Sequence, residues 1–205
     1  MKRMLILIGL VAPAGVTLAR PVVPSEKTLR PAVQKYLEEK GHFCLGKFDW
    51  PITVTEHDRQ IVTNDSVQMP VFEKLGLVTV SIPADDPTLR RYELTPEGRK
   101  YYLVKPMVSL GPGEQPVEHR GDFCAATLTL DRVVKWDKPT LVDGHPRTIV
   151  TYTYKVASAA DWTRDPQVQK VFPMIHRIVD GAGTMQLVQA FSWTNHAWVA
   201  LTPGS

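Results

Sequence analysis

The sequence predicts an α+β protein built from two parts, and three observations support this. Residues 25–105 combine helix caps and helix-spaced apolar residues with one predicted β-hairpin. Residues 121–202 alternate apolar and polar side chains in stretches that flank a single helical segment, the order ββαββ of an antiparallel sheet packed on a helix. Between the two parts, residues 106–120 are rich in glycine and proline, and this composition predicts a linker.

The first helix is expected to begin near Ser25 or Thr28 and to run to about Lys40, where Gly41 ends it. Its apolar side chains recur at helical spacing and define one face: Leu29, Val33, Tyr36 and Leu37. Residues 43–54 carry aromatic and β-branched side chains together with a proline. We therefore expect a loop and an edge strand there.

Three further elements complete the first part, and turn or cap residues bound each of them. They are a helix from Asp65 or Ser66 to Gly76, two strands at 77–82 and 90–94 joined by the turn 83–87, and a helix that begins at Pro96 after the cap residue Thr95.

The second part is expected to contain two hairpins separated by one helix. The first hairpin joins residues 123–136 to residues 147–157, with the turn at Asp143-Gly144. A helix over residues 165–179 follows, and Pro173 is expected to bend or split it. The last hairpin pairs residues 185–193 with 197–202 around Asn195-His196.

The first nineteen residues have the pattern of a secretory signal peptide. Lys2 and Arg3 precede the apolar run 4–11, and the small residues Thr17 and Ala19 stand where a signal peptidase would cut. We therefore expect a bacterial periplasmic or secreted protein with no transmembrane segment in the mature chain. The alternative is an uncleaved anchor helix, although the apolar run is short for a membrane span.

The charge balance gives no reason to expect a polyanionic partner. The chain has a formal net charge of +3 over 205 residues, and loss of Lys2 and Arg3 with the leader removes two of these charges. A nucleic-acid-binding domain usually carries a clear basic excess, so nucleic acid is not an expected partner.

The two cysteines, Cys44 and Cys124, predict one disulfide. Each follows a similar stretch, Gly41-His42-Phe43 and Gly121-Asp122-Phe123, and an even cysteine count in an exported chain favours a bridge. This bridge would join the two parts. The alternative is two separately buried thiols.

Residues 65–100 resemble the wing region of winged-helix regulators of the MarR and PadR kind. The shared features are Phe72-Glu73-Lys74-Leu75-Gly76-Leu77-Val78, the acidic turn Asp85-Asp86 with the arginines after it, and Leu94-Thr95-Pro96-Glu97-Gly98. The resemblance implies a winged-helix-like first part, and DNA binding in that family. The chemistry of this helix argues against DNA, because it offers Gln68 and Lys74 but no arginine.

The whole chain is also similar to a group of uncharacterised exported bacterial proteins. The stretches that carry this similarity are Phe43-Cys44-Leu45-Gly46-Lys47-Phe48-Asp49-Trp50-Pro51, Val67-Gln68-Met69-Pro70-Val71 and Val171-Phe172-Pro173-Met174-Ile175. The similarity implies a compartment outside the cytoplasm and no particular activity.

No catalytic motif, metal site or cofactor site is evident in the sequence. Gly-x-Ser-x-Gly, paired histidines at metal-ligand spacing, Cys-x-x-Cys and phosphate-binding glycine loops are all missing. We therefore predict no catalytic residues, no cofactor and no metal. The histidines His57 and His119, the latter beside Glu118, are expected to be solvated surface groups, and a hydrolase that uses one of them is the third hypothesis.

Tryptophans in predicted loops are the candidate binding residues. Trp50, Trp136 and Trp162 are the candidate anchors for a partner at the seam between the two parts. The alternative is that these tryptophans pack in the core or cover the seam themselves. The first hypothesis is therefore an exported, non-catalytic protein that binds an envelope protein or a small ligand. The second is a membrane-tethered winged-helix DNA-binding regulator.

Overall fold

A computed structural model describes residues 23–202 of the chain. The predicted signal peptide, residues 1–19, lies outside the described residues. The helices are α1 (Glu26–Lys40), α2 (Glu56–Gln60), α3 (Asn64–Lys74), α4 (Pro96–Arg99), α5 (Pro166–Val171) and α6 (Pro173–Asp180), with short 3-10 turns at Pro112–Glu114 and Asp161–Arg164. None of the helices within residues 23–202 has the length and apolar character needed to cross a bilayer.

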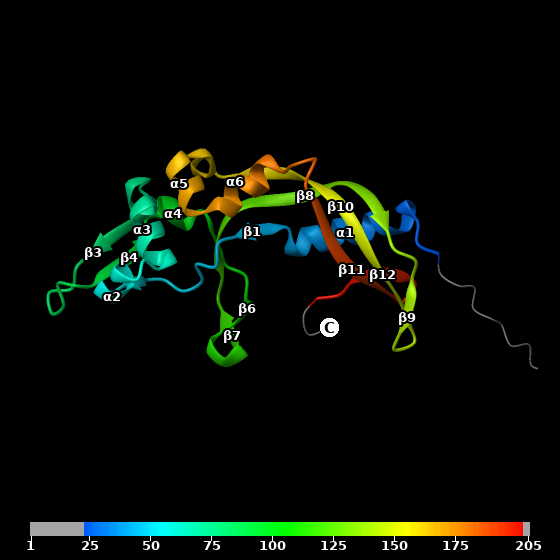
Figure 1. Cartoon of the computed structure of the whole chain (residues 1–205), viewed down its shortest axis with the longest axis horizontal. Coiled ribbons are helices and arrows are strands. Elements are labelled where there is room, and N and C mark those ends of the chain that lie inside the picture. Colours follow the sequence, from blue (N-terminus) through cyan, green and yellow to red (C-terminus); the bar gives the residue numbers. More distant parts are fainter. Residues whose placement is uncertain (1–22, 203–205) are drawn as a thin grey trace, which may run out of the picture.

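The fold is mixed α+β, with a curled antiparallel sheet as its largest element (Figure 1). The strands of this sheet are β1 (His42–Cys44), β5 (Tyr102–Leu103), β8 (Asp122–Trp136), β9 (Thr140–Val142), β10 (His145–Ala159), β11 (Gln186–Thr194) and β12 (Ala197–Ala200). At the other end of the molecule, β2 (Ile52–Val54), β4 (Arg90–Leu94) and β3 (Val78–Ser81) form a small sheet beside α2, α3 and α4.

Several elements form where local chemistry predicts them. Thr95 caps α4, accepting a hydrogen bond from the amide of Gly98 at 3.0 Å. Asp143 and Gly144 both have positive φ, at 51° and 77°, as a tight hairpin turn requires. The predicted helix over residues 165–179 is split into α5 and α6 at Pro173, which has no amide to donate. The short helix α2 is an element that the sequence analysis did not predict.

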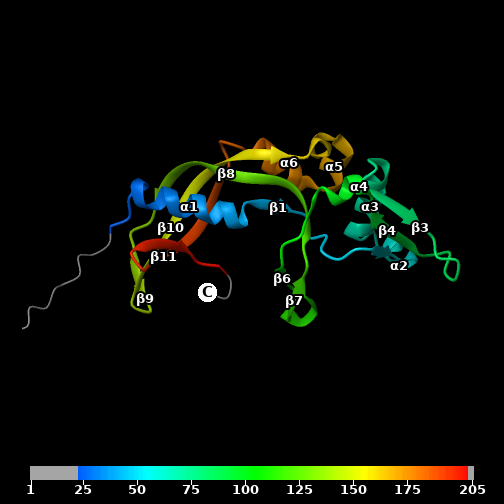
Figure 2. The same cartoon turned by 180° about the vertical axis from the view of Figure 1, so that it is seen from behind.

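The first helix packs against the sheet of the second part, although we expected it to belong to residues 25–105. Its buried side chains, Leu29, Val33 and Leu37, contact Val133, Val150, Tyr152, Phe191 and Trp198 on β8, β10, β11 and β12. Both views show α1 running below the arch of β8 (Figures 1 and 2). The helical spacing identified the apolar face correctly, but an apolar stripe does not specify which sheet it covers.

The two helices formed from the predicted helix of the second part pack against different ends of the molecule. Helix α5 packs against α3, whereas Ile178 on α6 packs against the sheet residues Leu128 and Tyr154. The hydroxyl of Tyr154 also donates to the carbonyl of Ile178 at 2.7 Å. The sheet is therefore covered by two helices, α1 and α6, where we expected one.

An aromatic core joins the two parts. We use this name for Phe72, Tyr101, Phe123, Trp162 and Phe172, which come from α3, the segment after α4, β8, the turn after β10, and the junction of α5 with α6. The ring centroid of Phe72 lies 5.1 Å from that of Phe123 and 5.0 Å from that of Phe172. Because this cluster combines side chains from both sides of residues 106–120, the two parts share one core.

The expected linker forms a β-hairpin, in which β6 (Met107–Leu110) pairs with β7 (Pro116–His119). Gly113 lies in the connecting turn with φ of 71°. The glycine and proline residues that suggested a linker therefore make a tight turn between two strands. The hairpin projects from the middle of the molecule (Figures 1 and 2).

The two Gly-x-Phe-Cys stretches pair with neighbouring parts of β8 and β5. Cys44 lies opposite Cys124 in the β1–β8 register, and the two form a disulfide. A Cβ on Gly41 would lie 2.5 Å from the carbonyl oxygen of Leu128, and one on Gly121 would lie 2.2 Å from that of Leu103. Each glycine therefore permits a close backbone approach beside the bridge.

Replacement of Leu29 by alanine should test the packing of α1 on the sheet. Leu29 is fully buried, so Leu29→Ala should lower the free energy of unfolding by about 2–5 kcal/mol. The matched control is Leu141→Ala, since Leu141 is 76% exposed and should tolerate the change. Urea unfolding would measure both. Equal losses in the two variants would contradict this packing.

Removal of the disulfide should destabilise the protein, because the unfolded chain without the bridge has more conformational entropy. The bridge closes a loop with a sequence separation of 80, so its loss should cost about 2–5 kcal/mol. The measurement compares urea unfolding of the wild type with and without reductant, and of the double variant Cys44→Ser/Cys124→Ser. Reductant should shift the wild type alone, and an unchanged wild-type midpoint after complete reduction would refute the stabilising role.

Candidate functional site

A buried carboxylate at the start of β8 holds the loop that follows β1. Asp122 is 4% exposed and accepts three backbone hydrogen bonds. The donors are the amides of Gly46, Lys47 and Phe123, at 3.1, 2.7 and 2.7 Å. Burial raises the pKa of the Asp122 carboxyl above its usual value, while the amide donors favour the ionised form and oppose that rise.

The second half of this loop is fixed by two further hydrogen bonds. The hydroxyl of Tyr102 donates to the carbonyl of Phe48 at 2.6 Å, and the indole nitrogen of Trp50 donates to the carbonyl of Lys47 at 3.2 Å. Asp49 lies between these two anchored residues. Its carboxylate therefore has a defined position even though 71% of the side chain is exposed.

His119 joins this loop to the β6–β7 hairpin. Its Nδ1 lies 2.8 Å from Oδ2 of Asp49, and its Nε2 lies 2.8 Å from Oγ of Ser109. The imidazole stacks on the ring of Phe48, with centroids 4.1 Å apart and planes 14° apart, and the His119 side chain is 8% exposed. Ser109 pairs with Val117, two residues before His119, so both polar side chains lie on one face of the hairpin.

Beside this hydrogen-bonded chain is a pocket of about 340 Å³, called here the Trp50 pocket. Its lining residues are Asp49, Trp50, Leu94, Arg99, Tyr102, Val104 and Arg120. The guanidinium groups of Arg99 and Arg120 form no ion pair or hydrogen bond with any of residues 23–202. The single acidic residue of the lining, Asp49, already accepts a hydrogen bond from His119. The pocket therefore combines apolar walls with unpaired positive charge.

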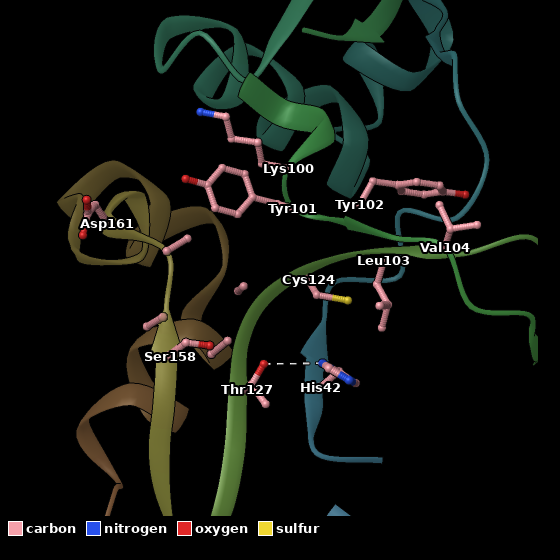
Figure 3. A pocket seen from close by; sticks show the side chains of 14 residues that line it. His42, Lys100, Tyr101, Tyr102, Leu103, Val104, Cys124, Thr127, Ser158 and Asp161 are labelled. Atoms are coloured by element: carbon pink, nitrogen blue, oxygen red, sulfur yellow. Dashed lines mark hydrogen bonds between the residues drawn. The ribbon is translucent and has the colours of Figure 1, made fainter. Parts of the chain in front are cut away.

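A larger groove of about 440 Å³ lies over the start of β8 and the end of β10 (Figure 3). Cys124 of the disulfide is among its lining residues, and the imidazole of His42 lies 3.4 Å from the Thr127 hydroxyl there. The groove also contains Ser158 and Asp161. Neither of these side chains is hydrogen-bonded to a histidine in the described part of the chain. The hydroxyl that does contact an imidazole in this groove is that of Thr127, and its partner is His42.

Metal-ligating residues do not gather in the described part of the chain. Residues 23–202 contain no group of three or more histidine, cysteine, aspartate or glutamate side chains placed to hold a metal ion.

The three predicted tryptophan anchors occupy different environments. Trp50 lines the pocket described above, and Trp162 lies in the aromatic core with 7% exposure. Trp136 is 36% exposed and ends β8, the strand whose other end carries Phe123 beside Trp50. The seam therefore holds Trp50 and Trp162, while Trp136 lies a full strand away. His57 is exposed on α2, away from the site.

Side chains of α3 that could contact bases are engaged with α5. The Gln68 amide donates to the carbonyl of Val171 at 2.9 Å, and the Lys74 ammonium donates to the side chain of Gln167 at 3.2 Å. A helix that reads DNA needs such groups free to enter a groove. This packing gives no support to a DNA-contacting role for α3.

No protein-family model, curated protein or solved structure matches this chain. The resemblances to winged-helix regulators and to exported bacterial proteins therefore stay predictions.

Sequence reasoning missed two of the three residues in the hydrogen-bonded chain. No role was predicted for Asp49, which appeared only within the stretch 43–51, or for Ser109, which lay in the expected linker. His119 was interpreted as a surface group beside Glu118, whereas its ring is nearly buried. The alternation around the turn 111–115 is the signal that could have revealed a hairpin with Ser109 and His119 on one face.

Replacement of Asp122 by asparagine should loosen the loop that carries Asp49 and Trp50. An amide has one acceptor oxygen where the carboxylate has two, so Asp122→Asn should cost about 1–3 kcal/mol of unfolding free energy. Hydrogen exchange at the amides of Gly46 and Lys47 should also accelerate. The control is Asp85→Asn in an exposed turn. Unchanged exchange at both amides would show that Asp122 does not hold the loop.

Proposed function

We propose that this chain is an exported bacterial protein that binds a small anionic molecule in the Trp50 pocket. The observation that carries the proposal is the pair of unpaired guanidinium groups, Arg99 and Arg120, in a pocket with aromatic walls. Arginine is well suited to carboxylate and phosphate groups because its planar fork donates two parallel hydrogen bonds. The ligand is therefore a carboxylate or phosphate that also has an apolar part.

The dimensions of the pocket favour a small ligand over an extended one. A volume of about 340 Å³ lies at the lower end of the range for small-molecule sites, roughly 300–1,000 Å³. Trp50 and Tyr102 offer flat apolar surface, and the loop that carries Trp50 is held by Asp122. A site whose walls are fixed before binding loses less conformational entropy when the ligand enters.

Export is supported by two independent features. The N-terminal pattern is that of a signal peptide, and the Cys44–Cys124 disulfide is typical of oxidising compartments. Together these features support a periplasmic or secreted location. An envelope protein remains an alternative occupant of the seam, with Trp50 as its anchor.

Residues 52–99 are, in this proposal, a winged-helix-like unit retained as a scaffold. Their element order is β2, α2, α3, β3, β4, α4, and β4 lies between β2 and β3. The unit presents Arg99 to the pocket, while α3 packs on α5. This arrangement favours a supporting role over the alternative of a membrane-tethered DNA-binding regulator.

Binding of phenyl phosphate, compared with neutral benzyl alcohol, tests the proposed ligand class. Calorimetry should detect phenyl phosphate alone, and Arg99→Gln or Arg120→Gln should each weaken its binding about tenfold or more, since a charge-assisted hydrogen bond contributes about 1.5–3 kcal/mol. Trp50→Ala should also weaken binding through lost apolar contact.

Two matched variants serve as controls for this measurement. Arg164 is exposed and lies outside the pocket, so Arg164→Gln should leave the affinity unchanged. Trp136→Ala removes an exposed tryptophan at the other end of β8 and should likewise have no effect. Equal affinity for the charged and neutral probes, or equal effects of the pocket and control variants, would refute anion binding at this site.

A further inference from the structure

We propose that Ser109, His119 and Asp49 form a hydrolytic site for esters, with Ser109 as the nucleophile and His119 as the general base. Asp49 is a positioning residue that orients the imidazole. No sequence motif marks this site, because its members come from separate segments; only His119 was a candidate, in the hydrolase hypothesis.

The hydrogen-bonded chain has the geometry that an activated serine requires. The Ser109 hydroxyl and the His119 Nε2 are 2.8 Å apart, within the range of about 2.6–3.2 Å for transfer of a proton to a base. Asp49 lies 2.8 Å from the other ring nitrogen. The Asp49 carboxylate accepts a hydrogen bond from the N–H at Nδ1. This keeps the ring proton on Nδ1 and leaves Nε2 free to accept the proton of Ser109.

The imidazole is held in this orientation by its surroundings. Stacking on Phe48 and an exposure of 8% restrict rotation of the His119 ring. The hairpin register fixes Ser109 relative to His119, and the hydrogen bonds of Asp122 fix the loop that carries Asp49. Precise support of this kind distinguishes a catalytic arrangement from a mobile surface pair.

The reaction balances without any co-reactant other than water. Oγ of Ser109 bonds to the ester carbonyl carbon while its proton passes to Nε2 of His119. The bond to the leaving alcohol breaks, and the leaving oxygen takes that proton. Water then gives a proton to Nε2 and its oxygen bonds to the acyl carbon. The acyl–Oγ bond breaks and the proton returns to Ser109, so one ester and one water give one acid and one alcohol.

The adjacent Trp50 pocket sets the substrate class. Asp49 lines this pocket, and Arg120 directly follows His119 in the chain. The substrate is therefore an ester that carries a second, anionic group, which Arg99 and Arg120 bind. This choice of substrate rests on the proposed function, whereas the assignment of the nucleophile and base does not.

A purely structural role for the same hydrogen bonds makes a different prediction. If His119 merely fastened the hairpin to the loop, substitutions would change stability but Ser109 would have no unusual reactivity. An unactivated serine does not react with fluorophosphonates, which form a covalent bond to activated serine oxygens with loss of fluoride. Reactivity toward such a reagent therefore separates the two roles.

Labelling of the wild-type protein with a fluorophosphonate, followed by peptide mass spectrometry, is the primary test. We expect modification at Ser109, none in Ser109→Ala, and a rate on the order of 100-fold lower in His119→Gln. Asp49→Asn should slow labelling about tenfold or more, with recovery in Asp49→Glu. The controls Ser81→Ala, His57→Ala and Asp85→Asn change exposed residues elsewhere and should label normally.

An unlabelled Ser109 in the folded wild type, or labelling that is insensitive to His119→Gln, would overturn the proposal. The wild-type result stands even if a variant fails to fold, and unfolding midpoints identify any such variant. Hydrolysis of neutral 4-nitrophenyl acetate should depend on Ser109 and His119 in the same way.

Comparison with the anionic ester mono(4-nitrophenyl) glutarate separates this inference from the proposed function. A preference of about tenfold or more for the anionic ester that disappears in Arg99→Gln and Arg120→Gln would support both. Labelling of Ser109 with no such preference would leave the hydrolytic site standing and refute anion binding. Phenyl phosphate binding without labelling would do the reverse.

Discussion

Three consecutive residues at the start of β8 hold the structure together, and each fixes a different part of it. Asp122 accepts the amide hydrogen bonds of the loop after β1, Phe123 lies fully buried in the aromatic core, and Cys124 forms the bridge to β1. Because neighbouring strand residues point to opposite faces, one short segment can bind three different partners. The site loop, the shared core and the edge of the curled sheet therefore depend on the same stretch of backbone.

The two predicted parts share one aromatic core. Phe72 and Trp162 come from opposite sides of the β6–β7 hairpin in the sequence, yet their rings are 5.6 Å apart. Separating the parts would expose aromatic side chains that each bury roughly 150–250 Å². Net folding stability is only about 5–15 kcal/mol. The free-energy cost of exposing these side chains is therefore larger than either part could tolerate alone. A second connection comes from α1, which belongs to the first part in sequence but packs on the sheet of the second part.

The sequence predicted those features that depend on local chemistry. Thr95 with Pro96 marked a helix start, Asp143-Gly144 marked a turn, and Pro173 marked a break, because each of these residues imposes its own backbone constraint. The packing of α1 and the chain of Asp49, His119 and Ser109 depend on contacts between distant segments. Asp49 and His119 are 70 residues apart, and no periodic pattern encodes their meeting. The cysteine pair was predictable because its count and its repeated context limit the alternatives.

In the proposed hydrolytic site, buried residues hold the hairpin and the loop that carry the reactive side chains. Ser109 and His119 belong to the projecting β6–β7 hairpin, and Asp49 belongs to the loop after β1, with 71% of its side chain exposed. Loops and hairpins place reactive groups well only when a rigid body supports them. Here the support is Asp122, which holds the loop and directly precedes Phe123 of the aromatic core, and Phe48, whose ring stacks on the imidazole. A change in that core would move Asp49 relative to His119, so the arrangement of the site depends on the closure of the whole fold.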